Sequence, residues 1–202
     1  MKNSLVTWLA LTLFSISSCT VMGTLYPVSK DKNDFIFKKE ILGKWGDPKE
    51  PNDFYVADTV AGNEGKLYLF QAVYSDKVDK KADTNWFNAH LLLIGNSYFL
   101  DCWLNMEKDL LENHHGHEDF LIPRHFIIRV SFPADNRLMM NVPDPDEIIK
   151  LVDQKKLHLT YATLKADDYL LLDQPAVLHK ELAASIKYPQ LYKESTVLQK
   201  LE

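Results

Sequence analysis

Residues 86–104, WFNAHLLLIGNSYFLDCWL, carry the clearest structural pattern in this chain of 202 residues. Two runs flank Gly95-Asn96, and a two-residue loop of this kind pairs the residues on either side of it directly. Leu91 is then opposite Leu100, and Ala89 is opposite Cys102. The face that holds these pairs is apolar apart from one hydroxyl group, so we predict that it belongs to the core. Its members are Phe87, Ala89, Leu91, Leu93, Tyr98, Leu100, Cys102 and Leu104.

The opposite face of this hairpin is mixed, with indole rings, an imidazole and a carboxylate. The register places His90 opposite Asp101, and the negative charge is expected to raise the pKa of His90. A carboxylate beside an imidazole can orient a general base, but it can equally stabilise a hairpin through a hydrogen bond. This face therefore indicates either a ligand cavity or an amphipathic surface.

Residues 124–132 repeat the alternation, and two of their polar side chains are candidates to join the mixed face of the hairpin. The resulting candidate ligand-binding residues are Trp86, His90, Asp101, Trp103, His125 and Arg129. Tyr68, Phe70 and Tyr74 are candidates for the rest of the lining, although such aromatic side chains are more often plain core.

The remainder of the chain has the pattern of a meander of short strands followed by helices. Apolar runs separated by turn clusters predict an antiparallel sheet. Asp144-Pro145-Asp146-Glu147 is a strong helix start, and a second helix is predicted from Gln174-Pro175 to about Lys187. The fold class is therefore mainly β, an antiparallel barrel or half-barrel meander with two helices in the C-terminal half. The further strand-like runs are 54–60, 66–74, 136–142, 157–164 and 169–172.

Gly43-Lys44-Trp45 is similar to the Gly-x-Trp motif that begins the lipocalin barrel, where the tryptophan is buried at one end. Most of residues 26–187 resembles a group of uncharacterised bacterial lipoproteins with a lipocalin-like barrel. That resemblance implies a fold and an envelope location, but no activity. The two late helices depart from true lipocalins. The segments that carry the resemblance are Tyr26-Pro27-Val28-Ser29, Leu42-Gly43-Lys44-Trp45, Ala89-His90-Leu91, Phe99-Leu100-Asp101, Pro123-Arg124-His125-Phe126 and Asp168-Tyr169-Leu170-Leu171-Leu172-Asp173.

The N-terminus has the pattern of an export signal. Met1-Lys2-Asn3 precedes an apolar run, Leu5 to Ile16, that is too short to span a bilayer. Ile16-Ser17-Ser18-Cys19 resembles the bacterial lipobox, in which the cysteine receives acyl chains such as palmitate. We therefore predict a lipoprotein signal peptide over residues 1–18.

The mature chain would then begin at a lipid-modified Cys19 that attaches it to the membrane. We expect residues 19–33 to form a polar spacer with little order before Pro27, and residues 34–202 to form one lipocalin-like domain. Thr20 follows the cysteine where the inner-membrane retention signal of enteric bacteria has Asp. This favours the outer membrane, facing the periplasm, in a Gram-negative organism.

Composition excludes several classes of function. The net charge of −5 provides no basic surface for nucleic acid.

The chain has two cysteines, so a lipid on Cys19 leaves Cys102 without a disulfide partner. Because Cys102 lies on the apolar face of the hairpin, we expect an inert thiol with a high pKa. Phosphate-loop, dinucleotide and Gly-x-Ser-x-Gly motifs are absent, and no cofactor is predicted.

One cluster offers metal ligands. His114, His115 and His117 lie within four residues and have carboxylates beside them, a donor set that zinc, copper or nickel prefers. The segment lies between strands, however, where polar residues are commonly just solvated.

We therefore expect a membrane-anchored envelope lipoprotein, a non-enzymatic binding module for an apolar or amphipathic small molecule or for an envelope partner. The alternatives are a metal-handling protein that uses the histidine loop and an envelope enzyme that uses the His90/Asp101 region.

Overall fold

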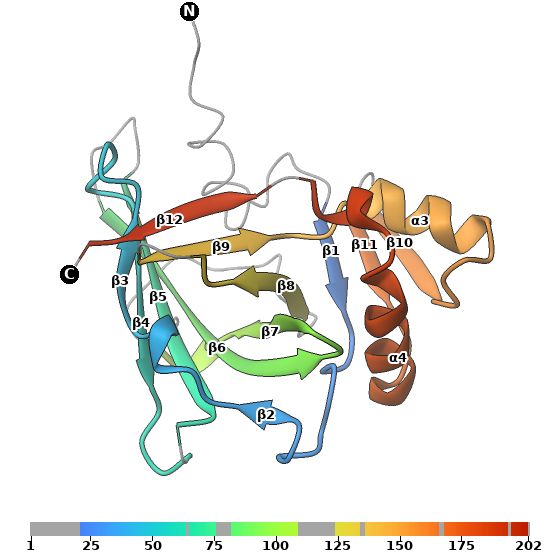
Figure 1. Ribbon diagram of the computed structural model, residues 1–202, viewed down its shortest axis with the longest axis horizontal. Coiled ribbons are helices and arrows are strands. Elements are labelled where there is room, and N and C mark those ends of the chain that lie inside the picture. Colours follow the sequence, from blue (N-terminus) through green and yellow to red (C-terminus); the bar gives the residue numbers. More distant parts are fainter. Residues whose placement is uncertain are drawn as a thin grey trace, which may run out of the picture.

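The computed structural model describes residues 21–63, 65–75, 82–108, 124–133, 136–165, 168–193 and 195–201, and it contains a closed antiparallel barrel (Figure 1). Seven of the barrel strands follow one another along the chain as a meander, and the eighth comes from the C-terminal end. The barrel strands are β3 (Gly43–Gly46), β4 (Phe54–Thr59), β5 (Leu67–Ser75), β6 (Ala82–Ile94), β7 (Ser97–Leu104), β8 (His125–Ser131), β9 (Arg137–Asn141) and β12 (Thr196–Lys200).

Strand β12 closes the barrel. It pairs with β3 through Lys200 and Trp45, and with β9 through Thr196 and Met140, while β8 and β9 pair through Val130 and Met140. The predicted fold class is confirmed, and of its two forms the closed barrel is the one observed. The C-terminal helices do not prevent closure, because they lie beside the strands and β12 returns past them to the ring (Figure 1).

The register predicted for the central hairpin is confirmed. Leu91 pairs with Leu100, His90 with Asp101 and Ala89 with Cys102. Gly95 has a φ of 62°, a conformation that glycine adopts without steric cost in a two-residue hairpin loop. One assignment is wrong: Leu93 is 47% exposed, because it lies next to the turn and outside the core.

The barrel interior is filled by inward-facing side chains, and Trp45 is one of them. Its ring is 2% exposed, and its Nε1–H donates to the carbonyl oxygen of Ile41 at 2.6 Å. Ile41 ends the short 3-10 helix η1 (Lys39–Ile41), which precedes β3. The predicted burial of Trp45 is confirmed. The buried interior residues are Ile41, Trp45, Ala57, Tyr68, Phe70, Ala72, Phe87, Ala89, Leu91, Leu100, Cys102, Ile128, Val130, Leu138, Met140 and Leu198.

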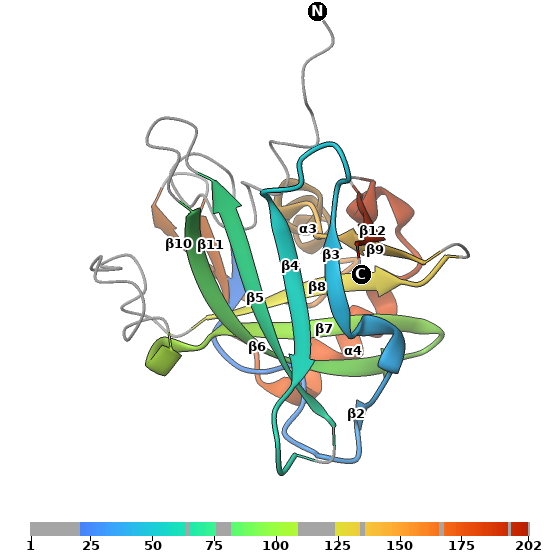
Figure 2. The same ribbon diagram turned by 90° about the vertical axis from the view of Figure 1, so that its left-hand side faces the viewer.

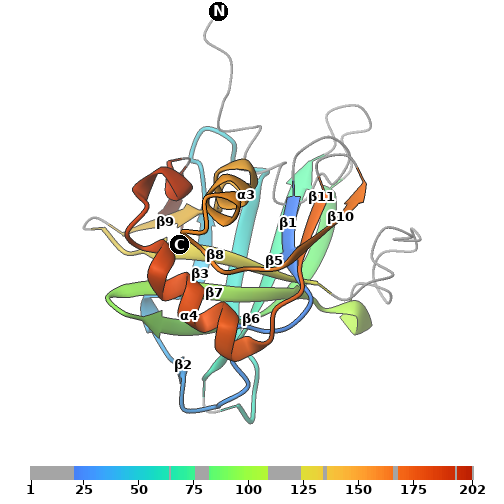
Figure 3. The same cartoon turned by 90° about the vertical axis from the view of Figure 1, so that its right-hand side faces the viewer.

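The helices lie against the outside of the barrel (Figure 3). Helix α3 (Pro145–Asp153) begins as predicted, because the Asp144 side chain accepts hydrogen bonds from the backbone N–H groups of Asp146 and Glu147. Helix α4 (Pro175–Ser185) and the 3-10 helix η3 (Pro189–Tyr192) follow. Together with the outward side of β6–β8 they enclose a second apolar core, which includes Leu92, Phe99 and Leu151. No helix among the described residues is long and apolar enough to cross a membrane.

The N-terminal part of the chain joins the sheet earlier than expected. Strand β1 (Val21–Thr24) runs parallel to β11 (Asp168–Leu171), and Thr24 pairs with His125 of β8. The expectation of little order before Pro27 is therefore wrong for these residues. Strand β10 (Tyr161–Lys165) extends this small sheet beyond β11.

A second early strand pairs with the end of β6, beyond the residues of β6 that pair with β5. Strand β2 (Phe35–Ile36) pairs with Leu92 and Leu91 of β6, and so holds the preceding segment, residues 27–35, against the barrel wall (Figure 2). The mixed face of the hairpin therefore lies beneath this segment and not inside the barrel.

Candidate functional site: an aromatic cleft outside the barrel

An open cleft of about 700 Å³ lies on the outer face of the barrel, and we call it the aromatic cleft. Three parts of the chain form it: the outward side of β6, β7 and the start of β8; the segment 27–35; and the turn that precedes β5. Its lining residues are Pro27, Ser29, Lys30, Lys32, Phe35, Gly62, Asn63, Lys66, Leu67, His90, Trp103 and His125.

Four rings form a continuous row along one wall of the aromatic cleft. Phe35 stacks on His90 with 3.8 Å between ring centroids and 15° between ring planes. The centroid distance is 5.0 Å from His90 to Trp103 and 5.4 Å from Trp103 to His125. His90, Trp103 and His125 come from three adjacent strands, and the spacing of neighbouring strands, about 4.8 Å, is close to these distances. The register of the sheet therefore builds the row.

Asp101 lies beneath this row and is fully buried. One carboxylate oxygen accepts the backbone N–H of Val28 at 2.8 Å, and the other lies 2.6 Å from Nδ1 of His125. An ionised carboxylate can only accept, so the Nδ1 of His125 carries the hydrogen and its Nε2 is the nitrogen left for a ligand. The contact also ties the segment 27–35 to the barrel wall.

The predicted pairing of His90 with Asp101 is thus correct in backbone register but wrong in its hydrogen bond. The carboxylate reaches His125 of the next strand, while the ring of His90 is held between Phe35 and Trp103. Burial lowers the pKa of His90, and this effect outweighs the attraction to Asp101; the nearby His125 lowers it further. The expectation that the pKa of His90 is raised is therefore wrong.

Two of the six predicted ligand-binding residues lie apart from the other four. Arg129 donates from Nη2 to the hydroxyl of Ser97 at 3.0 Å, and its guanidinium carbon lies 5.0 Å from the centre of the Tyr192 ring. Trp86 is four residues away from His90 along β6, and the Nζ of Lys108 lies 4.1 Å from its ring centre. His90, Asp101, Trp103 and His125 are the residues that the structure brings together.

The three tyrosine and phenylalanine candidates do not line the aromatic cleft. Tyr68 and Phe70 are buried inside the barrel, and the hydroxyl of Tyr74 donates to Asp83 at 2.8 Å. Cys102 is also buried in the barrel, where desolvation raises the pKa of its thiol. This agrees with the expected inert cysteine.

The histidine loop, His114, His115 and His117, lies outside the described residues. Across the part of the chain that the structure does describe, no three His, Cys, Asp or Glu side chains are grouped so as to hold a metal ion.

Sequence reasoning missed the half of the cleft that comes from residues 27–35 and 62–67. Phe35 supplies a ring, and the lysines at the mouth supply positive charge. Lys66 donates from Nζ to the backbone carbonyl of Lys32 at 3.1 Å, which joins the two turns. Residues 30–34 (Lys-Asp-Lys-Asn-Asp) form a charged cluster in the sequence, but no local pattern indicates that this cluster folds over the central hairpin.

One cavity inside the barrel is much smaller than the aromatic cleft. A cavity of about 40 Å³ between Tyr55, Phe87, Met140 and their neighbours is apolar and has room for a few waters or methyl groups. Small-molecule sites have volumes of roughly 300–1,000 Å³. The aromatic cleft, at about 700 Å³, falls within that range.

No family model, curated protein or solved structure matches this chain. The fold is an eight-stranded antiparallel β-barrel, a form that is consistent with a binding module.

Proposed function

We propose that this chain is a lipid-anchored protein of the cell envelope that binds an amphipathic small molecule in the aromatic cleft. The observation that carries the proposal is the cleft itself, a ligand-sized space with a row of four rings on one wall and lysines at its mouth. Rings bind apolar surface with little loss of conformational entropy, because they have few rotatable bonds.

The anchor is proposed from Ile16-Ser17-Ser18-Cys19. Strand β1 begins two residues after Cys19, so an acylated cysteine would hold the barrel close to the bilayer surface. Thr20 in place of Asp favours the outer membrane, facing the periplasm, in a Gram-negative organism. The resemblance of residues 26–187 to uncharacterised lipoproteins with a lipocalin-like barrel supports the same location.

A second candidate function, an envelope enzyme, is favoured by one specific observation. The buried carboxylate of Asp101 orients His125, the arrangement that a general base requires. Ser29 lines the same cleft, but its hydroxyl donates to the carboxylate of Asp34 and accepts the backbone N–H of Asp31 within a turn. We therefore rank binding above catalysis.

The proposed binding site is tested by titration with the neutral fluorescent amphiphile N-phenyl-1-naphthylamine. The protein is the full chain with Cys19→Ser, which removes the thiol of the lipobox and keeps every residue of the barrel. Trp103→Ala should weaken binding at least about ten-fold, the effect of removing a ring from a packed contact. Trp86→Ala is the matched control, because Trp86 also lies on β6–β7 but outside the cleft. Equal affinity in both variants would place the ligand elsewhere and refute the proposal.

The anchor is tested separately in an export-competent bacterial host. Cys19→Ser should give an uncleaved or soluble product in place of a membrane-bound one. A variant that is processed and membrane-bound as before would show that Cys19 carries no anchor.

A further inference from the structure

The charges that face the aromatic cleft are of one sign. Lys30, Lys32 and Lys66 line its mouth, and no carboxylate belongs to its lining among the described residues. Asp101 lies beneath the wall, but it is fully buried and both of its oxygens already accept hydrogen bonds. A ligand in the cleft therefore meets positive charge at the mouth.

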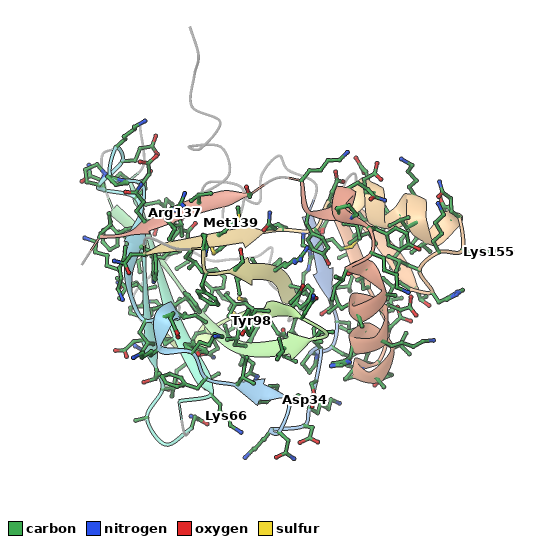
Figure 4. All side chains as sticks on the ribbon, viewed as in Figure 1. Asp34, Lys66, Tyr98, Arg137, Met139 and Lys155 are labelled. Carbon is green, nitrogen blue, oxygen red and sulfur yellow. The ribbon has the colours of Figure 1, made fainter. Side chains whose placement is uncertain are left out.

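The nearest acidic side chains in the same turn are directed to other partners. The carboxylate of Asp34 accepts the hydroxyl of Ser29, and that of Asp31 accepts the backbone N–H of Asn33. Within the described part of the chain, no carboxylate lies at salt-bridge distance from the three lysines, whereas Lys150 does have such a partner in Glu147. Figure 4 shows Lys66 and Asp34 on the same side of the molecule, near β2.

The hydrogen bond from Lys66 to the carbonyl of Lys32 brings like charges together at this mouth. An ammonium group has three donors, and this contact uses one of those on Lys66. The remaining donors, together with the exposed ammonium groups of Lys30 and Lys32, can be satisfied by the oxygens of one anionic group. The cleft lining therefore combines cationic groups from the turns with the aromatic row of Phe35, His90 and Trp103.

We propose that the ligand of the aromatic cleft is an amphipathic organic anion. Its sulfonate, phosphate or carboxylate group lies between Lys30, Lys32 and Lys66, and its apolar body covers Phe35, His90 and Trp103. This inference rests on the proposed function, since it names the class of molecule that the same cleft binds.

A pair of probes that differ in one charged group tests the inference. 8-Anilinonaphthalene-1-sulfonate carries a sulfonate on the ring system of the neutral N-phenyl-1-naphthylamine. Both are titrated into the Cys19→Ser chain and into three variants: Lys30→Gln/Lys32→Gln, Lys66→Gln and the control Lys156→Gln. Lys156 is exposed and does not line the cleft. Unfolding temperatures confirm that each variant is folded.

The double lysine variant should lose about ten-fold in affinity for the sulfonate probe, and Lys66→Gln about three-fold, since a solvent-exposed ion pair contributes up to about five-fold. Affinity for the neutral probe should stay unchanged, as should both affinities in Lys156→Gln. Raising the salt concentration to 0.5 M should weaken binding of the sulfonate probe alone.

The outcomes separate this inference from the proposed function. If both probes depend on Trp103 but neither depends on the lysines, the cleft binds amphiphiles and the anionic class is wrong. If Trp103→Ala affects neither probe, the proposed function fails as well.

Competition against the sulfonate probe then distinguishes a free anionic amphiphile from the anionic headgroup of a membrane lipid. Displacement of the sulfonate probe by monomeric dodecyl phosphate alone assigns a free amphiphile. Displacement by phosphatidylglycerol vesicles, but not by phosphatidylcholine vesicles, assigns a lipid headgroup. Displacement by none of these would overturn the inference.

Discussion

The two faces of the β6–β7 hairpin differ in what they enclose, although their residues alternate along the same strands. Leu91 and Leu100 point into the packed barrel, where one cavity has a volume of about 40 Å³, whereas His90 and Trp103 point outward into a cleft of about 700 Å³. In this barrel the inward face supplies stability, and the outward face, covered by residues 27–35, carries the candidate site. The candidate ligand site of this closed barrel therefore lies outside it.

The largest effect is expected inside the barrel, at Trp45. Trp45→Ala should lower the free energy of unfolding by about 3–5 kcal/mol, because it removes a fully packed ring and leaves the Ile41 carbonyl without its donor. Urea denaturation followed by circular dichroism measures this. A loss below about 1 kcal/mol would mean that the interior is not the stabilising region.

A smaller loss of stability is expected beneath the aromatic cleft. Asp101→Ala leaves the Val28 N–H and the His125 Nδ1–H without a buried acceptor, at a cost of about 1–3 kcal/mol. It should also weaken probe binding, because it frees the segment 27–35 that forms one wall. Asp58→Ala, at an exposed position, is the control. Reduced stability with unchanged probe binding would show that the contact between Asp101 and His125 does not support the aromatic cleft.

Part of the pH dependence of stability should come from His90, because its pKa is lowered in the folded state. Burial lowers its pKa in the folded state, so the unfolded chain binds a proton more readily. The folded state is therefore destabilised as the pH falls through the unfolded pKa of about 6.5. His90→Gln should make this loss smaller between pH 7.5 and 5. An identical pH profile in the variant would show that other groups cause it.

The smallest effect is expected at Leu93, and Leu91 on the same side of β6 provides the comparison. Leu91→Ala should cost about 2–5 kcal/mol, since Leu91 is fully buried. Leu93→Ala should change stability by less than about 0.5 kcal/mol, because Leu93 is 47% exposed. Thermal unfolding of the two variants measures the difference. Equal losses would mean that the core extends to the hairpin turn.

The strands that were predictable from the sequence are those whose alternation is long enough to show two faces. Strands β4 to β8, with six to thirteen residues, meet this condition, and the Gly95-Asn96 loop also determined the register that places His90 opposite Asp101. Strands β1, β2 and β12 are five residues or shorter. Their position depends on partners far away in the chain, such as Asp168 for Val21, which local periodicity does not reveal.

The candidate site was predictable only in part, for the same reason. The three rings on β6, β7 and β8 follow from register, but Phe35 and the lysines reach the cleft through tertiary contacts of a polar segment. Asp101 contacts His125, and the ring of His90 stacks on Phe35, a residue that the hairpin pattern does not contain.

The position of β12 in the ring has a consequence for how the protein folds. Lys200 pairs with Trp45, so the first and last strands of the barrel meet only when nearly the whole chain is available. Such non-local pairing slows folding, because the entropy of loop closure must be lost before the contacts form. The barrel therefore closes only after β12 has been synthesised and can reach β3.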